Sequence, residues 1–429
     1  MDRAPLEPLA EAGADLTLFC LLLLHIGSPN VFHEGKAGPY SLFVTVRPPT
    51  VIPGVAEIEI RAANPGVERI RLTPMPLAGE AAKFAPTPDL AARSKTDPQF
   101  FTGAVWLMVS GSFQIRVQAE GTQGPGELSV PLPAVARGTR KMDFALGALL
   151  SVLLLILAAG AVSIISAATN GSRKATLVAA VIVAAVIVFG NWWWGVEASN
   201  YDRYIYKPLE LAATVESSNQ LVLRLRDPGW IRSRKLDDLI PDHTHLMHLF
   251  AVRLPDLDRI WHLHPEKREQ AEFVQNLPDM PAGKYQLYAD IVHENGFPET
   301  AAVEIDLPSV KGKPLEGDDS AGPTANHGMT FSPDLRLVAE PKDLELYMGM
   351  PAHAVILKKD RTVFAHIHPT GSVPMAALML TGGPHTMPST PIPVVNFPYR
   401  FPTPGDYRVF AQIKRAGRVE TGLFDLRIR

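Results

Sequence analysis

The 429-residue sequence contains a single cysteine, Cys20. One thiol per chain excludes an internal disulfide framework and a cysteine-based zinc site. A metal ion in this protein must therefore be bound by histidine, methionine or carboxylate side chains. The phosphate-binding motif GxxxxGKS/T, the dinucleotide fingerprint GxGxxG and the nucleophile motif GxSxG are missing as well, so no nucleotide or serine-hydrolase chemistry is indicated.

The chain also has no excess of positive charge. The chain has 41 Lys and Arg residues against 44 Asp and Glu residues, which gives a formal net charge of −3. Without a basic domain or stripe, no nucleic-acid partner is expected. Proline and glycine, by contrast, are plentiful at 39 and 32 residues. Together with aromatic residues scattered between short apolar runs, this composition is typical of β-sandwich modules rather than helical bundles.

Residues 1–30 are expected to form a signal-like or anchor segment. The apolar run Leu16–Ile26 has eleven residues. This is too short to span about 30 Å of hydrocarbon but suits the core of a signal peptide. The residues before the run are acidic and no clear cleavage site follows it, so a buried strand is the alternative.

Residues 31–135 are expected to fold as an N-terminal immunoglobulin-like β-sandwich. Short segments such as Ser41–Val46 and Phe113–Val117 alternate between apolar and polar residues. This two-residue period is that of half-buried strands, and no long helical period interrupts it. A length of about 100 residues is that of one such sandwich.

Residues 143–195 are expected to form a two-helix transmembrane hairpin. Phe144–Ala168 has 25 residues without a charge, and Ala175–Trp194 has 20 residues without one. Each is long enough to cross a bilayer as a helix, and only residues 169–174 connect them. The chain segments before and after the hairpin must then lie on the same side of the membrane.

The basic residues beside the hairpin do not decide which side this is. Arg173 and Lys174 favour a cytoplasmic turn, whereas Arg137, Arg140 and Lys141 compete for the same role. The apolar run ahead of the first module favours an extracytoplasmic position for the modules. We therefore expect a cell-membrane protein with its globular parts on the extracytoplasmic side.

The C-terminal half indicates a duplication. Residues 209–308 and 327–429 are expected to be two related β-sandwich modules, joined at 309–326 by a linker rich in Gly, Pro, Lys and Asp. The segment HLFAVRLPDLDRIWHLHPE, which begins at His248, aligns with HAVILKKDRTVFAHIHPT, which begins at His353. The module ends align in the same order, so the sequence predicts an internal repeat of one sandwich unit.

Histidine is concentrated in the first copy and partly kept in the second. The segment Asp242–His248 is followed by the motif HLHP, and the second copy has MGMPAH and HIHP at the same places. The predicted metal ligands are His243, His245, His248, His262 and His264 in the first copy and Met348, Met350, His353, His366 and His368 in the second.

Strand geometry predicts how these side chains bind an ion. Residues i and i+2 of a strand point to the same face, so each HxHP pair can chelate one ion. A histidine from a neighbouring strand would complete a three-imidazole site. The expected sets are His248, His262 and His264 in the first copy and His353, His366 and His368 in the second. The competing interpretation is a structural turn in which backbone carbonyls satisfy each ring and no metal binds.

The two copies differ where Met348 and Met350 replace His243 and His245. Imidazole suits Cu(II), Zn and Ni, whereas thioether sulfur selects Cu(I). The exchange of two imidazoles for two thioethers in one frame predicts two sites tuned to different copper oxidation states.

Two segments resemble known extracytoplasmic domains. Trp106–Gly121 (WLMVSGSFQIRVQAEG) resembles a hairpin of FixH-like and YtkA-like domains, and the C-terminal modules resemble YtkA-like secreted HxHP domains at His245–His248 and Trp261–Pro265. The resemblance in the C-terminal modules covers about half the chain. It implies β-sandwiches outside the cytoplasm that are associated with copper handling and oxidase assembly. A membrane complex or a copper-receiving protein would then be the partner.

The predicted function is that of a membrane-anchored, extracytoplasmic metal-binding protein that buffers or delivers copper, with zinc as the alternative ion and no catalytic residue. The alternative from another class is a non-catalytic accessory or scaffold subunit whose modules contact proteins and bind no metal. A metalloenzyme would also need a general base, for which Asp242, Glu266 and Glu294 are the nearby candidates.

Overall fold

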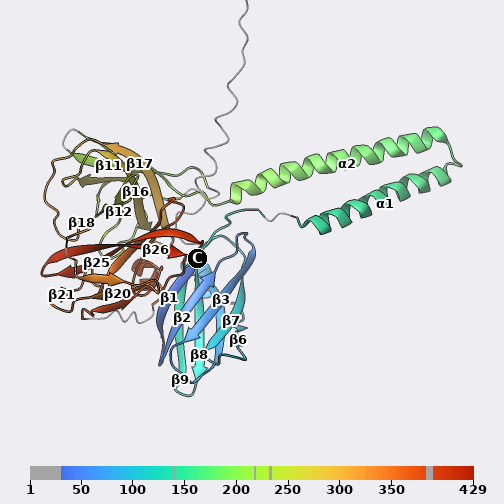
Figure 1. Cartoon of the computed structure of the whole chain (residues 1–429). Helices are drawn as coiled ribbons and strands as arrows, with labels where there is room; N and C mark the ends of the chain where they lie inside the picture. The colour runs from blue at the N-terminus through green and yellow to red at the C-terminus, as the bar shows by residue number, and fades with distance from the viewer. Residues whose placement is uncertain (1–29, 140–141, 217–218, 231–233, 326, 383–389) are drawn as a thin grey trace, which may run out of the picture.

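The protein is mainly β, with two long helices in the middle of the chain (Figure 1). The computed structural model describes residues 30–429 apart from 140–141, 217–218, 231–233, 326 and 383–389. The segment expected at 1–30, including Cys20, therefore lies outside the described residues except for Asn30. Three β-rich modules gather at one end of the molecule, and the helical hairpin projects away from them.

The N-terminal module is a two-sheet sandwich. The side chains of Leu42, Val44 and Val46 are fully buried in β2, as the two-residue period of the sequence requires. One sheet has the order β1-β2-β3-β7-β6 and the other β5-β4-β8-β9. The elements are β1 Val31–Ala37, β2 Tyr40–Arg47, β3 Gly54–Ala62, β4 Val67–Pro76, η2 Glu80–Lys83, β5 Asp89–Leu90, β6 Ala92–Arg93, β7 Phe100–Leu107, β8 Gly111–Gly121 and β9 Gly124–Ala134.

The hairpin consists of α1 (Phe144–Ala168) and α2 (Arg173–Tyr201), followed by η3 (Asp202–Tyr204). The Asp143 carboxylate caps α1 by accepting hydrogen bonds from two backbone N–H groups of its first turn. No side chain of α1 is buried, and Ala179 is the one buried residue of α2. Both helices are long and apolar enough to cross a membrane. Since no proline stops it before Pro208, α2 extends beyond the expected end at Trp194.

The first repeat closes a nine-stranded sheet around one core. The strand order is β14-β15-β11-β10-β17-β16-β12-β13-β18, and β10 joins β17 only at the parallel pair Glu210–Ala302. Side chains from both halves of this sheet, such as Leu223 and Leu287, share the core. The strands are β10 Glu210–Val215, β11 Gln220–Arg226, β12 His248–Arg253, β13 Ile260–Leu263, β14 Glu266–Glu269, β15 Glu272–Asn276, β16 Gly283–Val292, β17 Pro298–Leu307 and β18 Ser320–Gly322.

The second repeat is a sandwich of two sheets. One has the order β19-β20-β24, and the other has the order β21-β25-β22-β23 with β26 paired to β25. The elements are β19 Met329–Phe331, β20 Arg336–Ala339, β21 Leu344–Glu345, β22 His353–Lys358, β23 Phe364–Ile367, α3 Met375–Met379, β24 Val394–Asn396, β25 Gly405–Arg415 and β26 Arg418–Ile428.

The two repeats share their central strand pairing. The order β13-β12-β16-β17 in the first corresponds to β23-β22-β25-β26 in the second. His248 lies opposite Asp290 in the first repeat, and His353 lies opposite Gln412 in the second. Aligned histidines therefore start equivalent strands, each facing a polar residue of the next strand.

The segment 309–326 is packed against the first repeat rather than free. Val310 pairs with Met280, and β18 adds to the edge of β13. Ser320 at the start of β18 is buried. Composition predicted a linker here because Gly and Pro favour turns, but it does not show that β13 has an open edge that needs a partner.

The N-terminal module contacts the second repeat through the loop that follows the HxHP motif of that repeat. The Phe32 backbone N–H donates to Ser372 Oγ over 3.0 Å, and that of Glu34 donates to the Thr370 carbonyl over 2.8 Å. The end of this loop enters the core of the N-terminal module through Val373, Met375, Ala377 and Leu378. The module therefore holds the chain directly after His368.

Candidate metal centre

Eight histidine rings from the two repeats form one contiguous cluster, with neighbouring ring centroids 3.9 to 6.5 Å apart. Two groups within the cluster each bring one ring nitrogen per residue to within 4.8 Å of the others. We call them the first set, which contains His248, His262 and His264, and the second set, which contains His243, His353 and His368.

The first set has the membership expected from the sequence. Phe250 lies opposite His262 in the β12–β13 pair, so the HxHP motif runs beside the strand that begins at His248. His248 Nδ1 and His262 Nε2 lie at hydrogen-bond distance, 3.1 Å apart. Two nitrogens that bind one tetrahedral ion at about 2.0–2.1 Å lie about 3.3 Å apart. The spacing of these two nitrogens thus suits a shared ion.

Each histidine of the first set has its other ring nitrogen held by an outer group. His248 Nε2 donates to the Asp242 carbonyl over 2.9 Å, His262 Nδ1 lies 3.1 Å from Gln412 Oε1, and His264 Nδ1 lies 2.9 Å from Asp319 Oδ1. Metal-bound histidines typically carry such partners, which fix the tautomer and the ring orientation. This leaves His248 Nδ1, His262 Nε2 and His264 Nε2 as the ligand atoms.

The second set differs from the expected one. It contains His243, which belongs to the first repeat, in place of His366. His243 and Thr244 form a left-handed turn with φ angles of 46° and 77°, and Met348 and Gly349 form the equivalent turn with φ angles of 50° and 79°. The turn projects the His243 ring across the boundary between the repeats, where its centroid lies 4.9 Å from that of His368. His243 takes the place of His366 because the two repeats pack against each other. The two-residue period of a strand carries no information about that packing.

Buried ring nitrogens without a hydrogen-bond partner in the described part of the chain gather at this cluster. They are His243 Nε2, His264 Nε2, His353 Nδ1 and Nε2, His366 Nε2 and His368 Nε2. A structural role would instead satisfy each ring with a carbonyl or water. The unsatisfied nitrogens all belong to the two sets or to His366, which lies between them.

Burial keeps these imidazoles in the neutral form that metal binding requires. Loss of solvation is the main cause that lowers the pKa of His248, His262, His264, His353 and His368 well below the usual value, and neighbouring histidines lower it further. The pKa of His243 is also lowered, mainly by burial. Burial raises the pKa of Asp319 to about 6.

The two repeats orient each other's histidines reciprocally. Gln412 of the second repeat contacts His262 of the first, and Asp290 Oδ2 of the first repeat lies 3.3 Å from His366 Nδ1 of the second. His262 and His366 are equivalent positions, as are Gln412 and Asp290. The centre is therefore a product of the interface between the repeats.

His245, Met348 and Met350 are the other predicted ligands that belong to neither set. His245 stacks on His264 with a centroid distance of 3.9 Å, and its Nε2 lies 3.2 Å from Asp318 Oδ2. Met350 is fully buried, and Met348 is half-buried in the turn equivalent to that of His243. A role for either sulfur in tuning a site stays a prediction.

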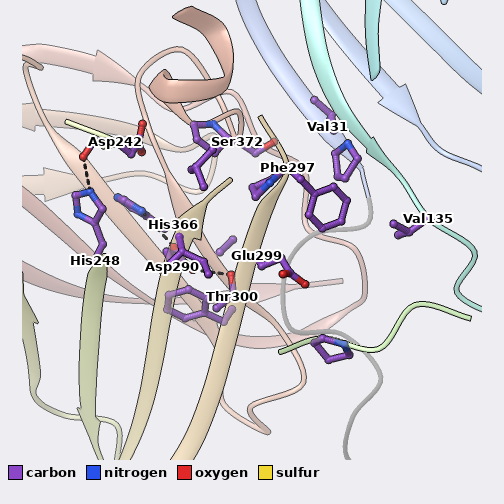
Figure 2. Close-up of a pocket in the computed structure, with 18 of the residues that line it drawn as sticks. Val31, Val135, Asp242, His248, Asp290, Phe297, Glu299, Thr300, His366 and Ser372 are labelled. Carbon is purple, nitrogen blue, oxygen red and sulfur yellow. Dashed lines mark hydrogen bonds and ion pairs between the residues drawn. The ribbon is translucent and has the colours of Figure 1, made fainter. Parts of the chain in front are cut away.

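A cavity of about 360 Å³ opens onto both sets (Figure 2). His248 of the first set, His368 of the second set and His366 line it, together with the carboxylates of Asp242, Asp290 and Glu299. Its wall also includes chain segments on both sides of the hairpin, where the Tyr206 backbone N–H donates to the Ala136 carbonyl over 2.7 Å. The cavity thus connects the histidines to the point where the chain leaves for the two helices.

Sequence reasoning missed the residues that orient the histidines. Asp318 and Asp319 fall in the segment taken as a linker, and Tyr347 donates to the Asp318 carbonyl over 2.6 Å while its hydroxyl lies 3.3 Å from His262 Nδ1. Asp290 and Gln412 had a detectable signal. They occupy the same position in the aligned module ends, each between an alanine and an isoleucine.

Fold and site together define a β-sandwich protein with two apolar helices suited to a membrane and a histidine cluster between two repeats. The chain belongs to the family described as Domain of unknown function (DUF8832), whose model matches residues 201–310 and again residues 309–429. The double match agrees with the duplication expected from the sequence. Among curated proteins, none matches the chain.

Two solved structures illustrate how distant the similarities are. A tetra-tandem repeat in the extending region of a large adhesion protein is 10% identical, with 94% of this chain and 75% of that chain covered and a TM-score of 0.19. The ICAM-5 D1–D4 ectodomain fragment is 12% identical, with 90% and 75% covered and a TM-score of 0.15. Scores this low carry no argument about function.

Proposed function

We propose that this protein binds copper ions at the first and second sets and buffers or delivers them while its helical hairpin anchors it in a membrane. The observation that supports this is the group of buried imidazole nitrogens without partners among the described residues. Leaving one such group unsatisfied costs roughly 1–3 kcal/mol. Coordination of an ion in each set would remove this cost at four histidines, His264 in the first set and His243, His353 and His368 in the second.

Copper fits the donor atoms best. Imidazole sites bind first-row divalent ions with an affinity that peaks at Cu(II), and thioether donors such as Met348 would favour Cu(I). Zinc, which three imidazoles also bind well, is the competing ion. The ion would be cargo, exchanged between ligands through the cavity that opens onto His248 and His368, and no bond-making chemistry is part of the proposal.

The proposed location is the cell membrane, with all three modules on the extracytoplasmic side. The hairpin supports one shared side for the modules, because α1 and α2 leave and return at the same end of the molecule (Figure 1). An extracytoplasmic side would let the centre receive copper outside the cytoplasm and pass it to a membrane complex or a copper-receiving protein.

Metal analysis of the detergent-solubilised full chain tests the proposal. We expect copper to bind at both sets, and we expect the His262→Ala/His264→Ala and His353→Ala/His368→Ala double variants each to lose part of it. A His327→Asn variant, whose ring lies outside both sets, should bind as much copper as the unmodified protein. Equal copper retention by all variants, or no copper in any, would leave the scaffold function, with modules that only contact proteins.

A further inference from the structure

We infer that the first and second sets form one dinuclear centre, in which two transition-metal ions bind side by side with His366 between them. This inference rests on the proposed metal binding and adds that the two sites are coupled rather than independent.

The separation between the sets is similar to the separation within them. Within the second set, the ring centroid of His243 lies 5.5 Å from that of His353, and within the first set that of His248 lies 5.3 Å from that of His262. Across the sets, the centroids of His243 and His248 are 6.5 Å apart. Rings of the two sets are thus direct neighbours, so two ions bound here would lie close to each other.

His366 fills the space between the two sets. Its ring centroid lies 5.4 Å from His248 and 5.9 Å from His262 in the first set, and 5.7 Å from His353 and 4.6 Å from His368 in the second. Its Nδ1 contacts Asp290, and its Nε2 has no hydrogen-bond partner among the described residues. His366 therefore offers an imidazole nitrogen in the space between the two sets.

Neither repeat completes its set alone. The second set takes His243 from the first repeat, and the first set depends on Gln412 of the second repeat to orient His262. Both sets therefore form in the same event, when the repeats pack against each other. Two independent sites, one in each repeat, would not need this exchange.

Carboxylates reduce the repulsion between two neighbouring cations. Asp290 contacts His366, Asp319 contacts His264, and Asp318 contacts His245. In a low-dielectric environment two like charges repel strongly, and negative groups placed at the outer side of the ligands offset this. One cavity opens onto both sets, so a single path serves both ions.

Electron paramagnetic resonance of the copper-loaded protein tests the inference. The detergent-solubilised full chain is titrated with Cu(II), and the integrated signal is measured at one and at two equivalents. Two adjacent Cu(II) ions couple, so the signal at two equivalents should be broadened and far below twice that at one. Unfolding the sample in acid should then restore the signal of both ions.

Two double variants serve as references. His353→Leu/His368→Leu and His262→Leu/His264→Leu should each bind one ion and show an isolated, full-intensity signal, whereas His327→Asn should behave as the unmodified protein. A signal that doubles between one and two equivalents overturns the dinuclear centre but leaves metal binding intact, as does a stoichiometry of one. A signal that stays low after acid release marks reduced copper and also counts against coupling. Absence of bound metal would remove the proposed function itself.

Discussion

His353 illustrates most clearly that burying the histidine cluster lowers the stability of the folded protein. It is fully buried, and neither of its ring nitrogens has a hydrogen-bond partner in the described part of the chain. Burial of a polar group that makes no hydrogen bond destabilises the folded state, and an apolar side chain of similar size is neutral or better. The proposed metal binding would account for such a residue.

The variant His353→Leu separates stability from binding. We expect the melting temperature of the metal-free protein to stay the same or rise, and the copper bound per chain to fall from two ions to one. Calorimetry with a chelator and metal analysis measure the two effects. The matched control is His368→Leu, which loses the same ion but also breaks the hydrogen bond from His368 to the Val373 backbone, so its metal-free form should be less stable by about 1 kcal/mol. A clear destabilisation by His353→Leu would argue for a structural imidazole.

For single residues, the sequence predicted which histidines of one strand end lie together. It did not predict which histidines are exchanged between the repeats. His262 and His264 are two residues apart on one strand end, and local geometry alone places both rings on one face. The exchange of His243 for His366 depends on contacts between residues more than a hundred positions apart, for which spacing along the chain holds no information.

Among the elements, the short helix α3 links the N-terminal module to the metal centre. Leu378 is buried in the core of the N-terminal module, although it belongs to the second repeat. The Ala376 backbone N–H donates to the Asp242 carboxylate over 2.7 Å. Because Asp242 also accepts from His248 through its carbonyl, this helix contacts the surroundings of both sets.

We predict that Leu378→Ala destabilises the protein by about 2–5 kcal/mol, as expected for a large core side chain cut to alanine. The loop that holds His368 would loosen, so the second set should lose affinity for copper more than the first. Urea denaturation and copper titration measure these effects. The control is Met379→Ala, in the same helix but 67% exposed, which should change neither the stability nor the copper affinity. Equal losses in both variants would contradict the role of the buried side of α3.

Most elements were predictable because their patterns are local. The apolar runs of the hairpin and the alternation in the strands of the N-terminal module are visible within a few consecutive residues, and the mainly β fold with a helical hairpin was correct. The strand β18 was missed because three residues, Ser320–Gly322, become a strand only through the edge of β13. Such a partner is supplied by the tertiary structure.

The stability of the whole molecule should depend on pH in a defined direction. Burial lowers the folded-state pKa of the five buried cluster histidines, so below about pH 6.5 the unfolded chain binds more protons than the folded one. Stability is therefore present above this pH and is lost as the pH falls, by up to about 1.4 kcal/mol per pH unit for each histidine that stays neutral.

His293 acts in the opposite direction. Burial alone would lower its pKa, but hydrogen bonds to Glu299 and Asp238 outweigh this and raise it, so its contribution is present below about pH 6.5 and declines at higher pH. Asp319, whose raised pKa also favours the folded state at acidic pH, acts in the same direction as His293. Since six histidines, His243 included, oppose these two groups, we expect the urea midpoint of the chelator-treated protein to be lower at pH 5.5 than at pH 7.5. An unchanged or higher midpoint at pH 5.5 would show that the cluster is protonated in the folded state.

The hairpin predicts that the two globular parts share one side of the membrane. In a Cys20→Ser background, single cysteines at Lys83 and Arg427, which are 66% and 80% exposed in their side chains, should react alike with a membrane-impermeant maleimide in intact cells. A cysteine at Lys174, in the first turn of α2 after the connection between the helices, should behave in the opposite way. Different labelling of Lys83→Cys and Arg427→Cys would rule out a spanning hairpin.

The docking of the loop after His368 on the N-terminal module has a consequence for biosynthesis. This loop leaves the ribosome roughly 240 residues after the module is complete, an interval of about 10–50 s at 5–20 residues per second. The surface of the N-terminal module that Leu378 later covers stays exposed during this time, while the hairpin and the whole first repeat are synthesised. Gln412, which orients His262, arrives later still. The nascent chain therefore carries scattered histidines, and the cluster is not complete until Gln412 has joined the fold.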